Sequence, residues 1–197
     1  MAAIGTRQRH PLRVAGLVAA VLVLVAALAA LVLFLWLRAY APLSAPGNLG
    51  FAPGPGLGAD VEPVTGSGGK TVFIPAYRKG RPFDTAFTIR NTGRFAVTVT
   101  GLGERGARPR ELEPGKLLAS DSSTASADPA NVHAFHDLRL DPGDAAIVVV
   151  RWSLSCGTGG EAEVYSDSVP LRFRYLSTFT RTQAVRLPFA VTLRCQG

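Results

Sequence analysis

The feature that most constrains this chain is an uninterrupted apolar segment near its N-terminus, Val14 to Leu37. Its twenty-four residues include neither a charged residue nor a proline. As an α-helix rising ~1.5 Å per residue, the segment would be about 36 Å long, which exceeds the roughly 30 Å hydrocarbon thickness of a typical bilayer. Residues 14–37 are therefore predicted to form one transmembrane helix with a slight tilt.

The charges beside this segment predict its orientation. Arg38 is the one charged residue that directly follows it, whereas four basic or titratable residues and no acidic residue precede it: Arg7, Arg9, His10 and Arg13. Positively charged flanks remain on the cytoplasmic side of a membrane. We therefore expect residues 1–13 in the cytoplasm and everything after Tyr40 on the other side of the cell membrane.

A cleaved signal peptide is the alternative interpretation of the same segment. Signal peptides have an apolar region of roughly 7 to 15 residues followed by small residues at the cleavage site. This segment is much longer, and its two candidate sites, Ala39-Tyr40-Ala41 and Leu43-Ser44-Ala45, each precede a proline. The sequence favours a retained anchor over cleavage before Pro42 or Pro46.

Residues 38–69 are predicted to be a linker. Of the twenty-eight residues from Pro42 to Gly69, thirteen are proline or glycine, and they show almost no apolar periodicity. A flexible coil of this length reaches on the order of 30 Å, enough to hold a folded domain clear of the lipid. Residues 70–197 then form one extracytoplasmic domain, which is long enough to bury its own core.

Within that domain the apolar residues repeat with a period of two, as in strands. Asn91-Thr92-Gly93 is a turn sequence between two such strands and predicts a hairpin. A later strand is apolar on both faces, which indicates a central position, and Pro188 indicates an edge or a bulge. Seven strands are predicted: Thr71–Ala76, Phe83–Arg90, Phe95–Thr100, His133–Leu140, Ile147–Leu154, Val169–Leu176 and Val185–Cys195.

This pattern, without any soluble helix, predicts an all-β domain. Two antiparallel sheets packed face to face bury such strands most simply. The expected fold is a seven-stranded immunoglobulin-like antiparallel sandwich preceded by one transmembrane helix. A closed barrel remains the alternative.

Four short motifs within residues 84–152 resemble a known family. They are Phe87–Gly93, Val97–Gly101, Leu140–Asp144 and Val148–Trp152. Their order resembles the F-x-I-x-N-x-G, V-x-V, L-x-P-G-x, V-x-V series of ASH-type domains, which are related to the major sperm protein and PapD-like sandwiches. The resemblance implies a non-catalytic, partner-binding domain. The layout of anchor, linker and sandwich is similar to that of uncharacterised envelope proteins of high-GC Gram-positive bacteria.

The two cysteines, Cys156 and Cys195, are expected to form a disulfide because the domain is exported. They end two predicted strands that are separated by one further strand, so an up-down-up path brings both to the same end of the domain. Each follows an inward-facing leucine by two residues, so both point inward. Two free cysteines in the core remain the alternative.

No complete catalytic motif is present. A phosphate-loop pattern fails because Val64 stands where glycine is required, and no strand precedes it. His133 and His136 lie three apart on a predicted strand and therefore leave opposite faces, which disfavours a shared metal. Two pairs of acids are predicted to be solvated loop charges: Glu111 and Glu113, and Glu161 and Glu163. We expect no enzyme activity, no cofactor and no metal.

Two surface features remain as candidates. The segment Leu102–Val132 is an insertion of a length that is usually functional or disordered. Four arginines also share the outward face of two neighbouring strands: Arg172, Arg174, Arg186 and Arg194. If these strands pair, the guanidinium groups would form a cluster for anionic lipid headgroups, wall polymers or an acidic protein. A plain solvated face is the alternative.

Net charge adds little to this picture. Of the formal +7, +4 lies in residues 1–41, so the remaining residues carry seventeen basic against fourteen acidic side chains. We expect a membrane-anchored, non-catalytic interaction or assembly module of the cell envelope, with the membrane, another envelope protein or an anionic polymer as its partner and no nucleic acid. The alternative is a small-ligand or metal-binding accessory domain of a membrane enzyme or transporter.

Overall fold

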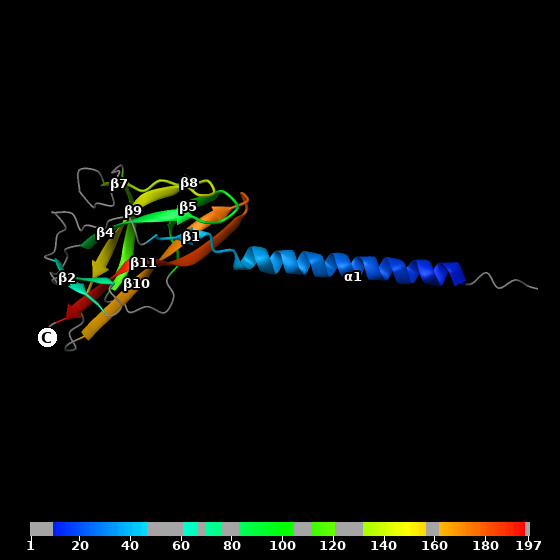
Figure 1. The fold of residues 1–197 in the computed structure, drawn as a ribbon, viewed down its shortest axis with the longest axis horizontal. Coiled ribbons are helices and arrows are strands. Elements are labelled where there is room, and N and C mark those ends of the chain that lie inside the picture. The colour runs from blue at the N-terminus through cyan, green and yellow to red at the C-terminus, as the bar shows by residue number, and fades with distance from the viewer. Residues whose placement is uncertain are drawn as a thin grey trace, which may run out of the picture. The chain divides into compact units, whose positions relative to one another are not determined.

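The computed structural model describes seven stretches of the chain, which form one helix and eleven strands (Figure 1). The chain divides into two compact units, Met1–Ala41 and Pro42–Gly197. The described stretches are residues 10–46, 61–66, 70–75, 83–104, 112–120, 132–156 and 162–195.

The first unit contains helix α1, which runs from His10 to Ala39. Its portion from Ala15 to Ala39 is long and apolar enough to cross a membrane, and none of it is buried against other parts of the chain. A helix that is apolar on all sides requires burial in a large core or in hydrocarbon. The structure thus agrees with the predicted helix, whose length and composition suit a membrane span.

The second unit consists of two β-sheets. The first has five strands in the order β1-β4-β9-β6-β7, all antiparallel to their neighbours. Residues on its central strand, β9, are buried on both faces, as the apolar pattern of that strand predicts. The five strands are β1 Leu43–Ser44, β4 Phe83–Asn91, β6 Leu112–Ser120, β7 Val132–Ala134 and β9 Ala145–Leu154.

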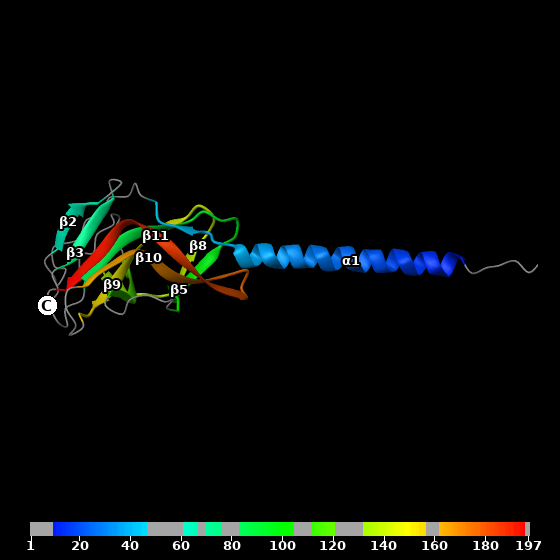
Figure 2. The same ribbon diagram turned by 90° about the horizontal axis from the view of Figure 1, so that it is seen from below.

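The second sheet has six strands in the order β2-β3-β11-β10-β5-β8. Strands β3 and β11 are parallel, and the other neighbours are antiparallel. In Figure 2, β10 and β11 form the longest hairpin of this sheet, with β3 beside β11. The six strands are β2 Val61–Thr65, β3 Thr71–Pro75, β5 Val97–Leu102, β8 Leu138–Leu140, β10 Ala162–Tyr175 and β11 Phe179–Cys195.

The core lies between the two sheets. The ring of Phe189 on β11 contacts Phe87 on β4 of the facing sheet, with 6.3 Å between centroids, and Phe73 on β3 at 5.5 Å. Trp152 on β9 is fully buried, and its indole Nε1 donates a 2.8 Å hydrogen bond to Thr85 Oγ1 on β4. The alternation of apolar residues along the strands is therefore explained by two sheets that each bury one face in a shared core.

Replacement of Trp152 by phenylalanine tests that buried hydrogen bond. We expect the free energy of unfolding to fall by about 1 to 3 kcal/mol, because a smaller ring fills the site and the Thr85 hydroxyl loses its donor. The double variant with Thr85→Val should recover part of this loss, since it removes the unpaired hydroxyl. Urea unfolding of the single and double variants would measure the coupling.

Pro188 lies at a bulge, which confirms that prediction. Ser166 pairs with Val191 and Ser168 pairs with Arg186, so several residues of β11, including Pro188, stand opposite one residue of β10. A proline has no N–H for the ladder, and a bulge is where this loss is tolerated.

Three interpretations of the strand pattern are wrong. The predicted hairpin of Phe83–Thr100 does not form, because β4 and β5 belong to different sheets and the turn between them crosses from one to the other. The predicted strand His133–Leu140 is divided into β7 and β8, which also lie in different sheets. The insertion Leu102–Val132 is not wholly irregular, because it contains β6, which pairs with β9.

The linker prediction for residues 38–69 is also wrong at both of its described ends. Strand β1 pairs with β4, and its Leu43 is only 3% exposed. Strand β2 pairs with β3 along five residues. Both strands therefore belong to the folded unit, which begins at Pro42; residues 47–60 lie outside the described part of the chain.

Candidate interaction surfaces

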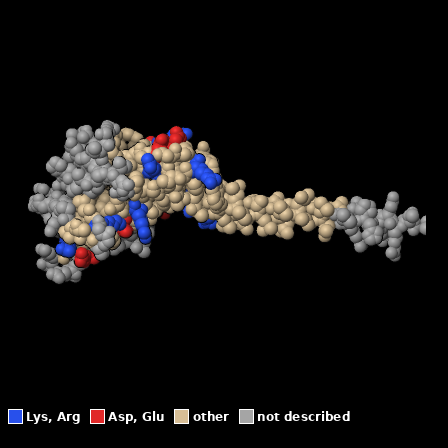
Figure 3. All heavy atoms as spheres, in the orientation of Figure 1, with Lys and Arg blue, Asp and Glu red and all other residues tan. Residues whose placement is uncertain are grey.

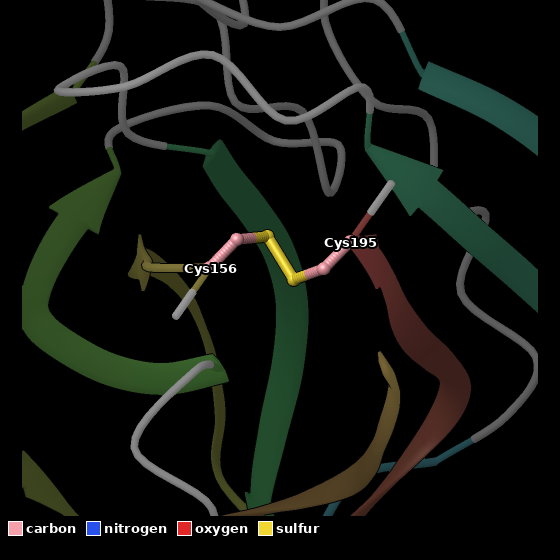
Figure 4. Close-up of a disulfide and its surroundings, with 2 residues drawn as sticks. All are labelled: Cys156 and Cys195. Atoms are coloured by element: carbon pink, nitrogen blue, oxygen red, sulfur yellow. A yellow bond between two sulfur atoms is a disulfide. The ribbon is translucent and has the colours of Figure 1, made fainter. Parts of the chain in front are cut away.

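A disulfide joins Cys156 to Cys195, the pairing expected from the sequence. Cys156 follows the end of β9 and Cys195 is the last residue of β11, so the bond ties one sheet to the other (Figure 4). The Cα atoms are 5.5 Å apart, and the side chain of Cys195 is buried. Strand direction and inward parity were thus sufficient to identify the pair.

The four predicted surface arginines are all exposed, but the structure does not bring them together. Arg172 and Arg174 lie opposite Thr182 and Thr180, near the tip of the β10–β11 hairpin. Arg186 pairs with Ser168, and Arg194 pairs with Glu163. At ~3.3 Å per residue, the eight residues from Arg186 to Arg194 correspond to about 26 Å.

Acidic side chains also divide this set. The Nε atom of Arg194 lies 3.6 Å from a carboxylate oxygen of Glu163, and both groups are exposed. On the face of the molecule that Figure 3 shows, basic side chains occupy separate patches, some with acidic side chains beside them. The single arginine cluster expected from parity is therefore not formed, and only Arg172 and Arg174 remain neighbours.

Arg174 has a basic neighbour that the sequence did not identify, Arg139 on β8. Thr98 on β5 pairs with Arg174 on one side and with Arg139 on the other, which places the three side chains in one row across the sheet. The alternation Leu138-Arg139-Leu140 indicates the outward direction of Arg139, but the row itself depends on long-range pairing.

These arginines line a hollow of about 410 Å³ at one end of the second sheet. The charges there have acidic partners: Arg139 Nη2 lies 3.1 Å from Asp141, and Arg174 Nη2 lies 3.8 Å from Asp137. Exposed ion pairs of this kind contribute little to stability, so another anion could replace the carboxylates. The lining residues are Phe95, Ala96, Thr98, Arg139, Arg174, Tyr175, Leu176 and Ser177.

The hairpin tip, defined as Tyr175–Phe179, borders this hollow. Leu176 is 44% exposed and Phe179 is 37% exposed, although both are large and apolar. The ring of Phe179 stacks on that of Tyr175 with 5.5 Å between centroids. Leu176 and Ser177 have φ angles of 47° and 63°, in the left-handed region that glycine and asparagine adopt most readily.

The chain joins the second unit at the same end. The carbonyl of Pro42 accepts hydrogen bonds from Thr92 N at 2.8 Å and from Thr92 Oγ1 at 2.9 Å. Leu43 N accordingly lies beside β4, and Gln183 Oε1 of β11 accepts a 3.0 Å hydrogen bond from it. Pro42 and Leu43, the first two residues of the second unit, are thus hydrogen-bonded to residues next to β4 and on β11 and do not belong to a free linker.

A second hollow, of about 250 Å³, lies on the outer face of β3, β10 and β11. Tyr165 is the most exposed large apolar side chain in its lining, which also includes Lys70 and Arg194. Lys70 pairs with Asp167 at 3.3 Å and Arg194 pairs with Glu163. Its positive charges are thus neutralised within the domain, and the arrangement selects no particular ligand.

Among the residues that the structure describes, the most closely aligned ion pair is Asp84 with Arg151, which lie opposite each other on β4 and β9. Arg151 Nε and Nη2 donate hydrogen bonds of 2.8 and 2.7 Å to the two carboxylate oxygens. Hydrogen bonding to Asp84 raises the pKa of Arg151 above its ordinary value, so the guanidinium remains charged over the accessible pH range. This pair links two neighbouring strands, and we infer that it has a structural role.

The remaining candidates do not assemble a chemical site. His133 and His136 are exposed, and among the described residues no group of three or more His, Cys, Asp and Glu could hold a metal ion. The loop interpretation of Glu113 is wrong, because this residue is buried within β6. Glu163 is exposed on β10 beside Arg194, and Glu111 and Glu161 lie outside the described residues.

The sequence was also compared with known proteins. No protein-family model matches the chain, and no curated protein matches it.

Proposed function

We propose that this chain is a single-pass membrane protein whose C-terminal unit lies outside the cytoplasm as an immunoglobulin-like sandwich and acts as a non-catalytic interaction or assembly module of the cell envelope. The observation that carries the proposal is the direct succession of an apolar helix long enough to span a bilayer and a disulfide-linked β-unit. Disulfides persist mainly in oxidising compartments. This supports the export that the flanking arginines predict.

Strand order supports the immunoglobulin-like assignment. The neighbours β1-β4-β9-β6 correspond to the A-B-E-D sheet of that fold, and β5-β10-β11 correspond to C-F-G. The unit differs in having further strands at the sheet edges and a disulfide between the ends of the E-like and G-like strands. The resemblance of residues 84–152 to ASH and PapD-like domains is compatible with this order and suggests that the unit binds a partner.

The structure also bears on retention of the anchor. Cleavage after Ala45 would remove Leu43, which is buried, and the backbone that Thr92 and Gln183 hold. Loss of a buried strand residue costs stability, so cleavage at this site is disfavoured. We propose that the helix is retained.

Protease treatment of intact spheroplasts tests the topology. We expect added protease to degrade the C-terminal unit and to leave a membrane-bound N-terminal fragment of the length of residues 1–41. A cytoplasmic marker protein should remain intact in the same sample. A C-terminal unit that is protected until lysis would show the opposite orientation, and a mature N-terminus at Pro42 or Pro46 would show cleavage.

The alternative function, a small-ligand or metal-binding accessory domain, would use the hollow beside Tyr165, although its lining selects no particular ligand. Thermal unfolding with candidate ligands or metal ions distinguishes the two functions. A ligand that binds the native state raises the midpoint with its concentration, whereas the assembly function predicts no such shift.

A further inference from the structure

We propose that the hairpin tip, together with Arg139 and Arg174, contacts the anionic surface of the lipid bilayer in which the helix is anchored. The proposal rests on the membrane anchor put forward above and specifies which surface of the second unit meets the lipid.

The covalent chain limits the distance between Pro42 and the last residue of the helix. Helix α1 ends at Ala39, and Pro42 is already hydrogen-bonded to Thr92. Only Tyr40 and Ala41 intervene, and three peptide units span at most about 11 Å. A linker of this length cannot hold Pro42 far from the lipid.

The hairpin tip lies at the Pro42 end of the unit. Thr92 belongs to the connection between β4 and β5, and Val97, the first residue of β5, pairs with Tyr175 at the tip. The opposite end of the hairpin, at the start of β10, carries Tyr165 instead. The tip is therefore the part of the hairpin that is nearest to Pro42, the first residue of the second unit.

The tip also has the composition of a membrane-contacting element. Among the described residues of the second unit, the exposed large apolar side chains are Val64, Tyr165, Leu176 and Phe179. Two of these four thus lie within one turn, three residues apart. An apolar turn flanked by cationic side chains is the pattern of segments that lie in a bilayer interface.

The turn geometry adds a second reason to infer a role outside the unit itself. A leucine with φ of 47° adopts a left-handed backbone conformation, which is unfavourable for an L-residue with a side chain. Its side chain recovers little of this through burial, because it is 44% exposed. Glycine or asparagine would form the same turn at a lower conformational free-energy cost. Insertion of the apolar side chain into lipid would explain why leucine occupies this position.

The adjacent arginines are suited to lipid phosphates. A guanidinium group donates two parallel hydrogen bonds to a phosphate. Arg174 precedes Leu176 by two residues, and Arg139 lies in the same cross-strand row through Thr98. Their carboxylate partners, Asp137 and Asp141, are exposed. When a lipid phosphate replaces one of these carboxylates, the carboxylate that is released remains in contact with water and does not become a buried, unpaired charge.

Fluorescence quenching in reconstituted vesicles tests this contact. The full-length protein would carry Leu176→Cys, labelled with a fluorophore under non-reducing conditions that leave the native disulfide intact. The matched control is Tyr165→Cys, a position that is also exposed but lies near the start of β10, about 36 Å from Leu176 at ~3.3 Å per residue. The vesicles would contain phosphatidylcholine, phosphatidylglycerol and a lipid with a quencher on its acyl chain.

We expect quenching at Leu176→Cys to be several-fold stronger than at Tyr165→Cys. It should weaken when phosphatidylglycerol is omitted, and also when salt is raised from 0.1 M to 1 M, where the Debye length falls from about 10 Å to about 3 Å. Equal quenching at the two positions would overturn the proposal and leave the tip available to a protein partner.

The variant Arg139→Ser/Arg174→Ser, made in the labelled Leu176→Cys background, tests the charge contribution. Both positions are exposed, so the thermal midpoint should change little, whereas quenching in anionic vesicles should fall at least twofold. Quenching that is unchanged in this variant would overturn the role of the arginines. Flotation of the vesicles in alkaline carbonate distinguishes the lipid contact of the tip from the membrane anchor itself. Protein that floats with the vesicles but shows no quenching contradicts only the lipid contact. Protein that fails to float contradicts the anchor as well.

Discussion

Replacement of Cys195 by serine is expected to lower the free energy of unfolding of the second unit by about 2 to 5 kcal/mol. The disulfide joins residues that are 39 apart in sequence, and in the chain-entropy model a loop of this size stabilises by roughly 4 kcal/mol. It also ties the end of β9 to the end of β11, which belong to different sheets. Without it, no covalent cross-link joins the ends of these two strands.

Pulse proteolysis of the full-length protein across a urea series would measure this loss. Cys156→Ser and reduction of the native protein should shift the midpoint by similar amounts, because each removes the same bond. Thr180→Ala, an exposed position on β11, is the control and should change stability by less than about 0.5 kcal/mol. A cysteine variant that resembles this control would contradict a stabilising role for the disulfide.

Alternation along the chain was sufficient to locate most strands, since many of them alternate buried and exposed residues over part of their length. It also predicted the central position of β9, where Ile147 and Val149 add apolar residues to the outward face. These two residues belong to a second cluster, with Ala86 and Leu118 on neighbouring strands, on the outer side of the first sheet. The local apolar pattern therefore predicted the burial of a strand correctly where that burial was uniform along the strand.

Strand β6 was missed because its alternation is interrupted. Its pairing with β9 shifts register between Pro114 and Lys116, so Leu112 and Glu113 are buried before the shift and Leu117 and Leu118 after it. A period-two search cannot follow such a change of phase. Strand β1 was missed for another reason: with two residues it has no period, and its burial depends on β4 and Gln183, which are distant in the sequence.

The candidate surface shows the same limit. Parity placed Arg172, Arg186 and Arg194 on the outer face correctly, but β11 is seventeen residues long, so residues on one face can lie far apart. Arg139 joins Arg174 only because β8 and β10 both pair with β5, which no local pattern reveals. Side-chain direction could thus be predicted from the sequence, whereas the grouping of side chains required the sheet order.

The connection between β4 and β5 shows how correct turn chemistry can support an incorrect hairpin. Asn91 ends β4, is fully buried, and accepts a 2.9 Å hydrogen bond on Oδ1 from Gly93 N, as in a turn. Its Nδ2 also donates to the carbonyls of Phe95, at 2.8 Å, and Leu140, at 3.0 Å. The side chain therefore fixes a connection that crosses between sheets, and Leu140 belongs to a strand about fifty residues away.

Replacement of Asn91 by alanine is therefore expected to lower the free energy of unfolding by about 2 to 5 kcal/mol, because it removes three hydrogen bonds of a buried amide. Asn91→Asp should be at least as destabilising at neutral pH, since the introduced carboxylate faces two carbonyl oxygens. Burial raises the pKa of such a carboxyl, so this variant should regain stability relative to the native protein as the pH falls and the group becomes protonated.

Thr92→Ala provides the matched control in the same connection. The Thr92 hydroxyl donates to Pro42 O, but Thr92 N donates to the same oxygen, so that carbonyl keeps a partner when the hydroxyl is removed. A loss of no more than about 1 kcal/mol is expected. Urea midpoints of the three variants between pH 5 and pH 8 would give the comparison. If Asn91→Ala is no less stable than Thr92→Ala, then the buried amide does not hold the crossover, and packing of the strands on either side must do so.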